Sequence, residues 1–264
     1  MSGQREVITR LQDEGVLDSI RWAQDSAISR ALDDYSEDAG HDAAWLGQTL
    51  FVLFRDRLDR VFSCGRYALQ AGADEGAGLD LVRIELTKKD IDGRPDLSPD
   101  LVRRINRNGS PGWALGDIQF LLSSCEFGKI AKLPWPRKSP TKQQVAMKAP
   151  LPTDLPPGLF DIEEPLGVKN LADPNAELDP FIVAHSLDPV SQRRELVFGR
   201  SRFNRGGGDA WYWYENLLTL PPNQGGRRLD APTPSGPDNV PDAPVKLRKG
   251  ASARPAMPKA NGQR

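Results

Sequence analysis

Apolar residues recur three and four positions apart through the N-terminal part of the chain, which is typical of amphipathic helices. This pattern predicts helices over residues 5–13, 16–35 and 43–63, with a break at Gly15 and an N-cap at Asp42. The third helix has the widest apolar stripe, so we expect it to be central to a bundle or to cover a sheet. Its charged residues are assigned to the solvent side: Arg55, Asp56, Arg57, Asp59 and Arg60.

Shorter apolar or alternating stretches in the remainder of the chain indicate strands. They lie at residues 79–88, 117–123 and 181–185, and a short helix fits the second of these nearly as well. A proline that follows a capping serine predicts a short helix over residues 99–106. Strands therefore dominate the later part of the chain, after a helical beginning.

A β-hairpin is predicted from residues 195–203 and 210–218, joined by the glycine-rich segment 204–209. Its second strand contains four consecutive aromatic residues, Trp211, Tyr212, Trp213 and Tyr214. Strict alternation along a strand would place both tryptophans on one face and both tyrosines on the other. One face is expected to pack on the core.

Together these elements predict an α+β protein, in which an N-terminal helical region packs on or beside a small mixed or antiparallel sheet. Composition divides the chain further. We expect a helix-rich α+β domain over residues 1–128, a basic proline-rich linker over 129–158, and a small β-rich lobe over 159–220 that holds the hairpin. Residues 221–264 contain many prolines and few large apolar side chains, which predicts a disordered tail.

Composition alone favours no class of ligand. Hydrophobic residues make up 38% of the 264 residues, and the net charge of −1 gives no overall bias toward nucleic acid. The charge is uneven, because residues 1–66 are acidic overall while residues 129–148 hold lysines and arginines and no acid. The excess of arginine over lysine, with abundant alanine, aspartate and glycine, is typical of a bacterial genome rich in G and C.

We expect a cytoplasmic protein. Residues 1–10 are polar, which argues against an export signal, and no apolar run approaches the length of a membrane span. The two cysteines, Cys64 and Cys125, lie far apart in the sequence, so reduced and mostly buried thiols are expected.

The hairpin region is the candidate binding surface, because it combines arginines with aromatic rings. Such residues hold single-stranded nucleic acid by stacking and phosphate pairing, and they also dominate protein–protein interfaces. A buried strand whose arginines reach water around its rim explains the same composition. The candidate residues are Arg193, Arg194, Arg200, Arg202, Arg205, Trp211, Tyr212, Trp213 and Tyr214, together with Trp135 of the linker.

Recognisable catalytic and metal-binding patterns are missing from the sequence, so no catalytic residue, metal or cofactor is predicted. His185 lies close to Ser186 and Asp188, but sequence neighbours do not make a catalytic triad, and we expect a strand histidine satisfied by a local hydrogen bond. Asp80 and Glu85 suggest a metal-dependent nuclease. In that pattern the second acid and the lysine are two residues apart, whereas Glu85 and Lys88 are three apart, which favours a solvated strand face.

Three functions follow, in order of preference. The first is a cytosolic, non-enzymatic interaction or regulatory module that binds an unidentified protein partner through the basic, aromatic hairpin. The second is a nucleic-acid-binding protein that uses the same arginines and rings. The third is a metal-dependent nuclease or another hydrolase.

Overall fold

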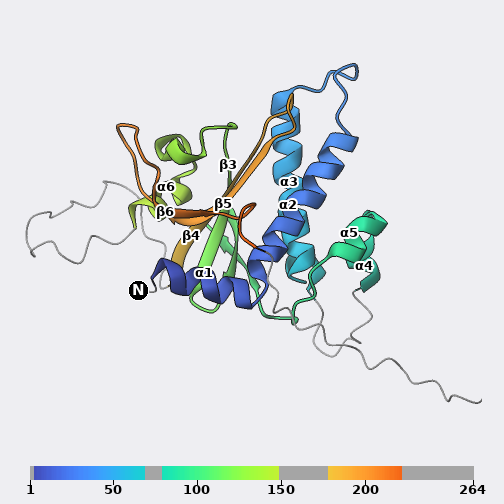
Figure 1. Ribbon diagram of the computed structural model, residues 1–264, viewed down its shortest axis with the longest axis horizontal. Coiled ribbons are helices and arrows are strands. Elements are labelled where there is room, and N and C mark those ends of the chain that lie inside the picture. Colours follow the sequence, from blue (N-terminus) through green and yellow to red (C-terminus); the bar gives the residue numbers. More distant parts are fainter. Residues whose placement is uncertain (1–2, 69–78, 149–177, 222–264) are drawn as a thin grey trace, which may run out of the picture. The chain divides into compact units, whose positions relative to one another are not determined.

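A six-stranded mixed sheet forms the centre of the fold, seen in a computed structural model that describes residues 3–68, 79–148 and 178–221 (Figure 1). The strands lie side by side in the order of the sequence, and only β3 and β4 run parallel. The strands are β1 (Arg103–Arg107), β2 (Ser110–Leu115), β3 (Ile118–Ser124), β4 (Asp179–Leu187), β5 (Arg194–Ser201) and β6 (Trp211–Asn216). With the helices described next, this sheet makes an α+β fold, as the sequence predicts.

Three helices precede the sheet, where the apolar periodicity predicts them. They are α1 (Gln4–Asp13), α2 (Val16–Asp33) and α3 (Ala43–Val61). Asp42 is the N-cap of α3, since its carboxylate accepts a 2.7 Å hydrogen bond from the Trp45 N–H. The remaining helical segments are α4 (Leu79–Arg83), α5 (Lys88–Gly93), α6 (Pro140–Met147), η1 (Gly65–Tyr67), η2 (Ile130–Lys132) and η3 (Trp135–Arg137).

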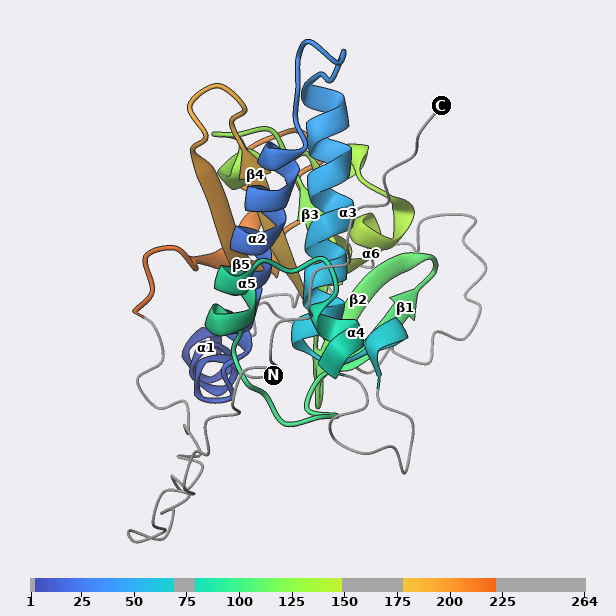
Figure 2. The same ribbon diagram turned by 90° about the vertical axis from the view of Figure 1, so that its right-hand side faces the viewer.

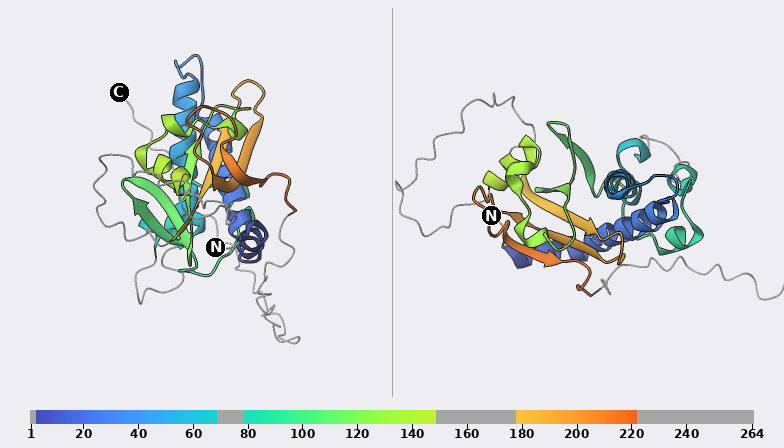
Figure 3. Two further views of the ribbon diagram at one scale, coloured as in Figure 1. Left: turned by 90° about the vertical axis from the view of Figure 1, so that its left-hand side faces the viewer. Right: turned by 90° about the horizontal axis from the view of Figure 1, so that it is seen from above.

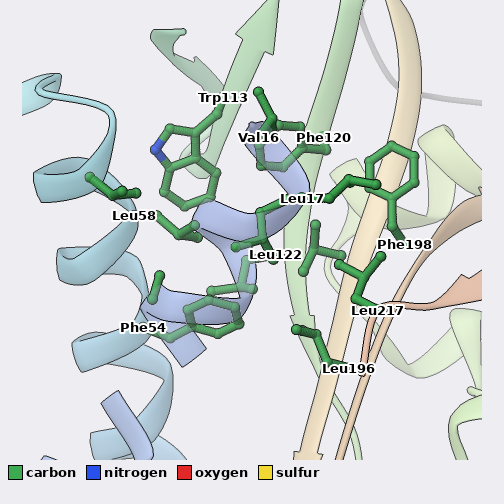
Figure 4. Packing of buried hydrophobic residues seen from close by; sticks show 14 of the residues in the cluster. Val16, Leu17, Phe54, Leu58, Trp113, Phe120, Leu122, Leu196, Phe198 and Leu217 are labelled. Carbon is green, nitrogen blue, oxygen red and sulfur yellow. The ribbon is translucent and has the colours of Figure 1, made fainter. Parts of the chain in front are cut away.

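The larger core lies between α1–α3 and one face of the sheet (Figure 2). Alternation along β4 directs Phe181 and Val183 into this core and Ile182 and Ala184 to the opposite face. In Figure 4, Phe54 and Leu58 of α3 face the side chains of the strands. The large side chains in this core include Trp113, Phe120, Leu122, Leu196 and Phe198.

The opposite face of the sheet is covered by η2, η3 and α6, which lie across the sheet from α2 and α3 (Figure 3). These elements occupy residues 130–147, so the described part of the segment expected to be an extended linker is folded. Trp135 is fully buried there, and its indole N–H donates a 2.7 Å hydrogen bond to the Ala210 carbonyl. The prolines of this segment predict an extended chain, and the sequence does not show which surface the apolar residues of the segment cover.

The three strands of the lobe expected over residues 159–220 extend the sheet of the preceding residues. β4 pairs with the full length of β3, with Phe181 opposite Phe120. Apolar side chains from both sides of the expected boundary therefore share the same two cores. The rest of the predicted linker, the first part of the lobe and the tail from residue 222 onward lie outside the described residues.

Two predicted elements are wrong. Residues 79–88 form α4 and the start of α5, not a strand, because Arg60 donates to the Val82 and Ile84 carbonyls at the end of α4, each at 2.7 Å. Thr87 and Asp90 then start α5 with a reciprocal capping box. The predicted helix over residues 99–106 gives way to β1, because Asn108 and Gly109 both adopt positive φ and close a β1–β2 hairpin.

The charged side of α3 is also not wholly exposed. Arg57 and Arg60 are buried, since α4 and the turn after it lie over this part of the helix. Both guanidinium groups pair with Asp56, which also accepts hydrogen bonds from Arg66 and Tyr67. Burial alone would raise the pKa of Asp56, but these hydrogen bonds outweigh it and hold the pKa below its ordinary value.

Candidate functional site

The predicted hairpin is present as β5 and β6, and β6 is the edge strand of the sheet. The Leu217 N–H donates to the Leu196 carbonyl at 2.9 Å, which fixes the alternation of hydrogen bonding between the two strands. Backbone groups of Trp213 and Glu215 consequently point toward β5, while those of Tyr214 and Asn216 point to the open edge. Among the described residues, no further strand pairs with this edge.

A β-bulge changes the faces that the aromatic residues occupy. Arg200 lies opposite Trp213, but the next residue, Ser201, lies opposite Trp211, so Tyr212 is an extra residue on β6. The two tryptophans consequently lie on opposite faces of the sheet, and strict alternation is wrong here. Trp211 packs edge-on against Trp135 with ring centroids 5.5 Å apart, whereas Trp213 lies 5.6 Å from Phe181 in the larger core.

The two tyrosines remain accessible, with Tyr212 45% and Tyr214 41% exposed. Arg202 is also exposed, and its guanidinium lies 5.7 Å from the centroid of the Tyr212 ring. Tyr214 lies across Gly199, where an added Cβ would be only 2.6 Å from the tyrosine Cβ. Absence of a side chain at position 199 therefore allows the close approach of β6 at this point.

The other predicted arginines are dispersed. Arg200 is buried, paired with Asp179 and placed over the Phe181 ring. Arg194 pairs with Asp25, and Arg193 lies over Phe127 at the far end of β5. With Trp135, Trp211 and Trp213 used in packing, the accessible candidates near the β5–β6 connection are Arg202, Arg205, Tyr212 and Tyr214, which we call the tyrosine edge.

Further exposed cations lie beside the tyrosine edge. The Ala210 N–H donates to the Ala131 carbonyl at 3.0 Å, which joins the β5–β6 loop to η2. Lys132 follows directly in the chain and is exposed, as is Arg137 of η3. The hairpin therefore contacts the basic segment, although the tryptophan of that segment is buried.

A cavity of about 430 Å³, not foreseen from the sequence, lies at the other end of the sheet. It is bounded by the first turns of α3 and by the chain that leaves the parallel strands β3 and β4. Its lining residues are Ala43, Leu46, Gly47, Leu50, Ser124, Cys125, Glu126, Phe127, His185, Ser186, Leu187, Asp188 and Pro189. Its place is indicated in the sequence only by the polar residues that follow two buried strands.

His185 lies at this cavity with only 1% of its surface exposed, and neither ring nitrogen has a hydrogen-bond partner within the described ranges. The predicted local hydrogen bond is therefore wrong. Phe54 contacts the imidazole edge-on at 5.0 Å and Phe51 lies at 6.4 Å. Burial, with smaller contributions from Lys142 and Lys138, lowers the pKa of His185 to about 3, so the ring is neutral. An unsatisfied buried polar group costs about 1–3 kcal/mol.

Nucleophilic chemistry finds no support around this histidine. The Ser186 hydroxyl donates a hydrogen bond to the Glu195 carboxylate, and alternation places Ser186 on the opposite face of β4 from His185. The Asp188 carboxylate accepts from Ser191 and from the Val190 N–H, not from the imidazole. Burial raises the pKa of the Cys125 thiol to about 12, so the reactive thiolate is suppressed.

The residues of the nuclease hypothesis do not form the arrangement that hypothesis requires. Asp80 belongs to α4, and Glu85 follows that helix with a positive φ of 61°. They are consequently not on alternating faces of one strand. No cluster of three or more metal-ligating side chains occurs within residues 3–68, 79–148 and 178–221.

Comparison with protein-family models, with curated proteins and with solved structures finds no match to this chain. The described helices include none with the length and apolar character needed to cross a membrane.

Proposed function

We propose that this protein is a non-enzymatic interaction module that binds an extended, acidic segment of a protein partner along the tyrosine edge. The observation that carries the proposal is an open edge strand with two accessible tyrosines, Tyr212 and Tyr214. The two unpaired thiols, Cys64 and Cys125, accord with a cytoplasmic setting for this module.

Strand addition is supported by the outward-directed backbone of β6. Tyr214 presents an N–H and a C=O group that β5 does not use, and Asn216 presents its N–H, while the Asn216 carbonyl accepts hydrogen bonds from Thr219. A partner strand gains main-chain hydrogen bonds from such an edge, while side-chain contacts supply specificity. The bulge at Tyr212 restricts docking to the part of β6 that follows it, since bulges interrupt regular pairing.

An acidic partner is supported by the exposed charges near this edge. Arg202 and Arg205 belong to the edge itself, and Lys132 and Arg137 lie in the adjoining segment. Asp209 is the exposed acid in the connecting loop, and Glu215 accepts a hydrogen bond from Gln4. Complementary charge accelerates encounter and suppresses partners of the wrong sign.

Single-stranded nucleic acid is the second candidate, because the guanidinium of Arg202 over the Tyr212 ring is a combination that also holds a base or phosphate. The two candidates differ in their dependence on salt. Binding through phosphates weakens steeply as salt rises, whereas strand addition retains its backbone hydrogen bonds.

The test selects displayed random peptides on the full-length protein and titrates a labelled oligonucleotide in parallel. We expect acidic, β-prone peptides whose binding falls at least tenfold in Arg202→Glu. Arg103→Glu is the matched control, because Arg103 is an exposed arginine on the opposite edge strand, β1. Oligonucleotide binding that is abolished by moderate salt would favour the second candidate instead.

A second pair of variants separates the backbone from the side chain at position 214. Tyr214→Thr removes the ring and keeps the outward N–H, whereas Tyr214→Pro removes both and spares the bonds to β5. Strand addition predicts that proline weakens peptide binding well beyond threonine. Equal binding by the two variants would contradict it.

A further inference from the structure

Two lysines lie close together at the start of α6. Lys138 precedes the helix, and Lys142 belongs to its first turn. Lys138 is held in place, because its ammonium donates a hydrogen bond to the Ser124 carbonyl at the end of β3. The charge of Lys138 acts on Lys142 and disfavours a second ammonium at this point.

Lys142 has no partner that would neutralise its charge. Within the described residues its side chain makes no hydrogen bond or ion pair, and no carboxylate is among the groups that shift its pKa. The amine lies against α3, with Nζ 5.7 Å from the centroid of the Phe51 ring. The titratable group of β4 nearby is His185, which is neutral.

The amine of Lys142 is accessible to small molecules. The residue is only partly buried, and its Nζ atom, although it has no hydrogen-bond partner in the described part of the chain, is not one of the fully buried polar atoms. A small solute in the surrounding water therefore reaches the nitrogen.

Lys142 also has the protonation behaviour of a nucleophile. Burial and the charge of Lys138 lower its pKa to about 8. At pH 7 about a tenth of the side chain is consequently an unprotonated amine, against about 0.03% for a lysine of ordinary pKa. Desolvation and a second cation nearby are two of the ways in which proteins activate a lysine amine.

The charges around this amine favour a reaction that produces an anion. Lys138 and the positive end of α6 lie together here, and the N-cap residue Ser139 makes no side-chain hydrogen bond to the first N–H groups of the helix. Acylation or imine formation would leave a neutral or positive group among these cations. Addition to carbon dioxide instead creates a carboxylate, which is the acid that this cluster lacks.

We propose that Lys142 reacts reversibly with carbon dioxide to form a carbamate. The Nζ lone pair forms a bond to the carbon of CO₂, one C=O electron pair moves onto oxygen, and the nitrogen releases a proton to water. The product carries one negative charge and pairs with the Lys138 ammonium. The side chain at position 142 thereby changes from a cation or neutral amine into an anion.

The proposal is tested on the full-length protein equilibrated at pH 7.5 with ¹³C-labelled carbon dioxide and bicarbonate. Carbamate is observed by ¹³C NMR, and alkylation with triethyloxonium ion then fixes it as a stable ethyl ester for peptide mass spectrometry. We expect occupancy at Lys142 at least tenfold above that at Lys148, an exposed lysine at the other end of α6. Equal occupancy at the two lysines, or none at Lys142, would overturn the proposal.

Variants test the site and its environment. Lys142→Arg keeps the positive charge and should abolish the carbamate signal. Lys138→Met removes the cation that stabilises the carbamate and lowers the pKa of Lys142, so it should reduce occupancy at Lys142 at least threefold. Lys148→Met is the matched control and should leave occupancy at Lys142 unchanged.

A carbamate signal that persists in Lys142→Arg, or an occupancy in Lys138→Met equal to that of the parent, would refute the assignment. Neither lysine belongs to the tyrosine edge, and Arg202→Glu should leave the carbamate unchanged. Peptide binding and carbamate formation therefore fail or succeed separately.

Discussion

Replacing His185 by phenylalanine should make the protein less sensitive to mild acid. The imidazole is buried against Phe54 and Phe51 with neither nitrogen hydrogen-bonded within the described residues. Protonation would bury a charge close to Lys142 and Lys138, so the folded state resists it. Phenylalanine keeps an aromatic ring at this position and cannot take up a proton.

The magnitude follows from the two pKa values of the histidine. Burial, aided by the two lysines, lowers the folded-state pKa of His185 to about 3, against an ordinary value of 6.5 in the unfolded chain. Below about pH 6.5 the unfolded state therefore binds a proton that the folded state excludes, and stability falls until the folded pKa is reached. Between pH 7 and pH 5 this difference removes about 2 kcal/mol of unfolding free energy.

Urea unfolding followed by tryptophan fluorescence at pH 7 and pH 5 measures this loss for both proteins. All other titrating groups are shared, so they largely cancel when the variant is compared with the parent. We expect the parent to lose about 2 kcal/mol more than His185→Phe over this interval. Equal losses would show that the imidazole is accessible to water or paired, and would refute the burial on which the reasoning depends.

Three further predictions concern packing and charge. Trp135→Ala should lower the unfolding free energy, measured in urea, by about 3–5 kcal/mol, and Trp135→Phe should lower it by less. A loss below about 1 kcal/mol in Trp135→Ala would mean that residues 130–147 do not pack on the sheet. Asp56→Asn should destabilise the protein at neutral pH and reduce its acid sensitivity. The depressed pKa of Asp56 adds stability that is lost as the pH falls through that pKa. An unfolding free energy with the same pH profile in variant and parent would contradict this. Gly199→Ala should lower the unfolding free energy by about 1–3 kcal/mol, measured by thermal or urea unfolding, since the added Cβ would lie 2.5 Å from the Trp213 carbonyl oxygen. An unchanged stability would show that β6 can move away.

Helices with sustained apolar periodicity could be predicted from the sequence, and so could the β5–β6 hairpin. The stripe of α3 extends over five turns, which leaves little ambiguity. The alternating pattern over residues 79–88 predicts a strand, because so short a pattern does not record that Arg60, far away in the sequence, donates a hydrogen bond to the end of α4. The β1–β2 hairpin had a local signal in Asn108 and Gly109, and the proline-based helix prediction overlooked it.

The candidate site could be predicted only in part, because its exposure depends on a bulge. Composition identified Arg202, Tyr212 and Tyr214, but one extra residue on β6 moved Trp211 and Trp213 into different cores. The cavity at His185 arises where two parallel strands separated by a long stretch of sequence end beside α3. Such a site has no local signature, since each of its walls comes from a different part of the chain.

The central claim, an open edge on β6, is tested most directly by amide hydrogen exchange of the free protein. The account predicts fast exchange at Tyr214 and Asn216, whose N–H groups face outward, and strong protection at Glu215 and Leu217, which bond to β5. Equal protection at all four positions would contradict it, because the edge would then already be covered.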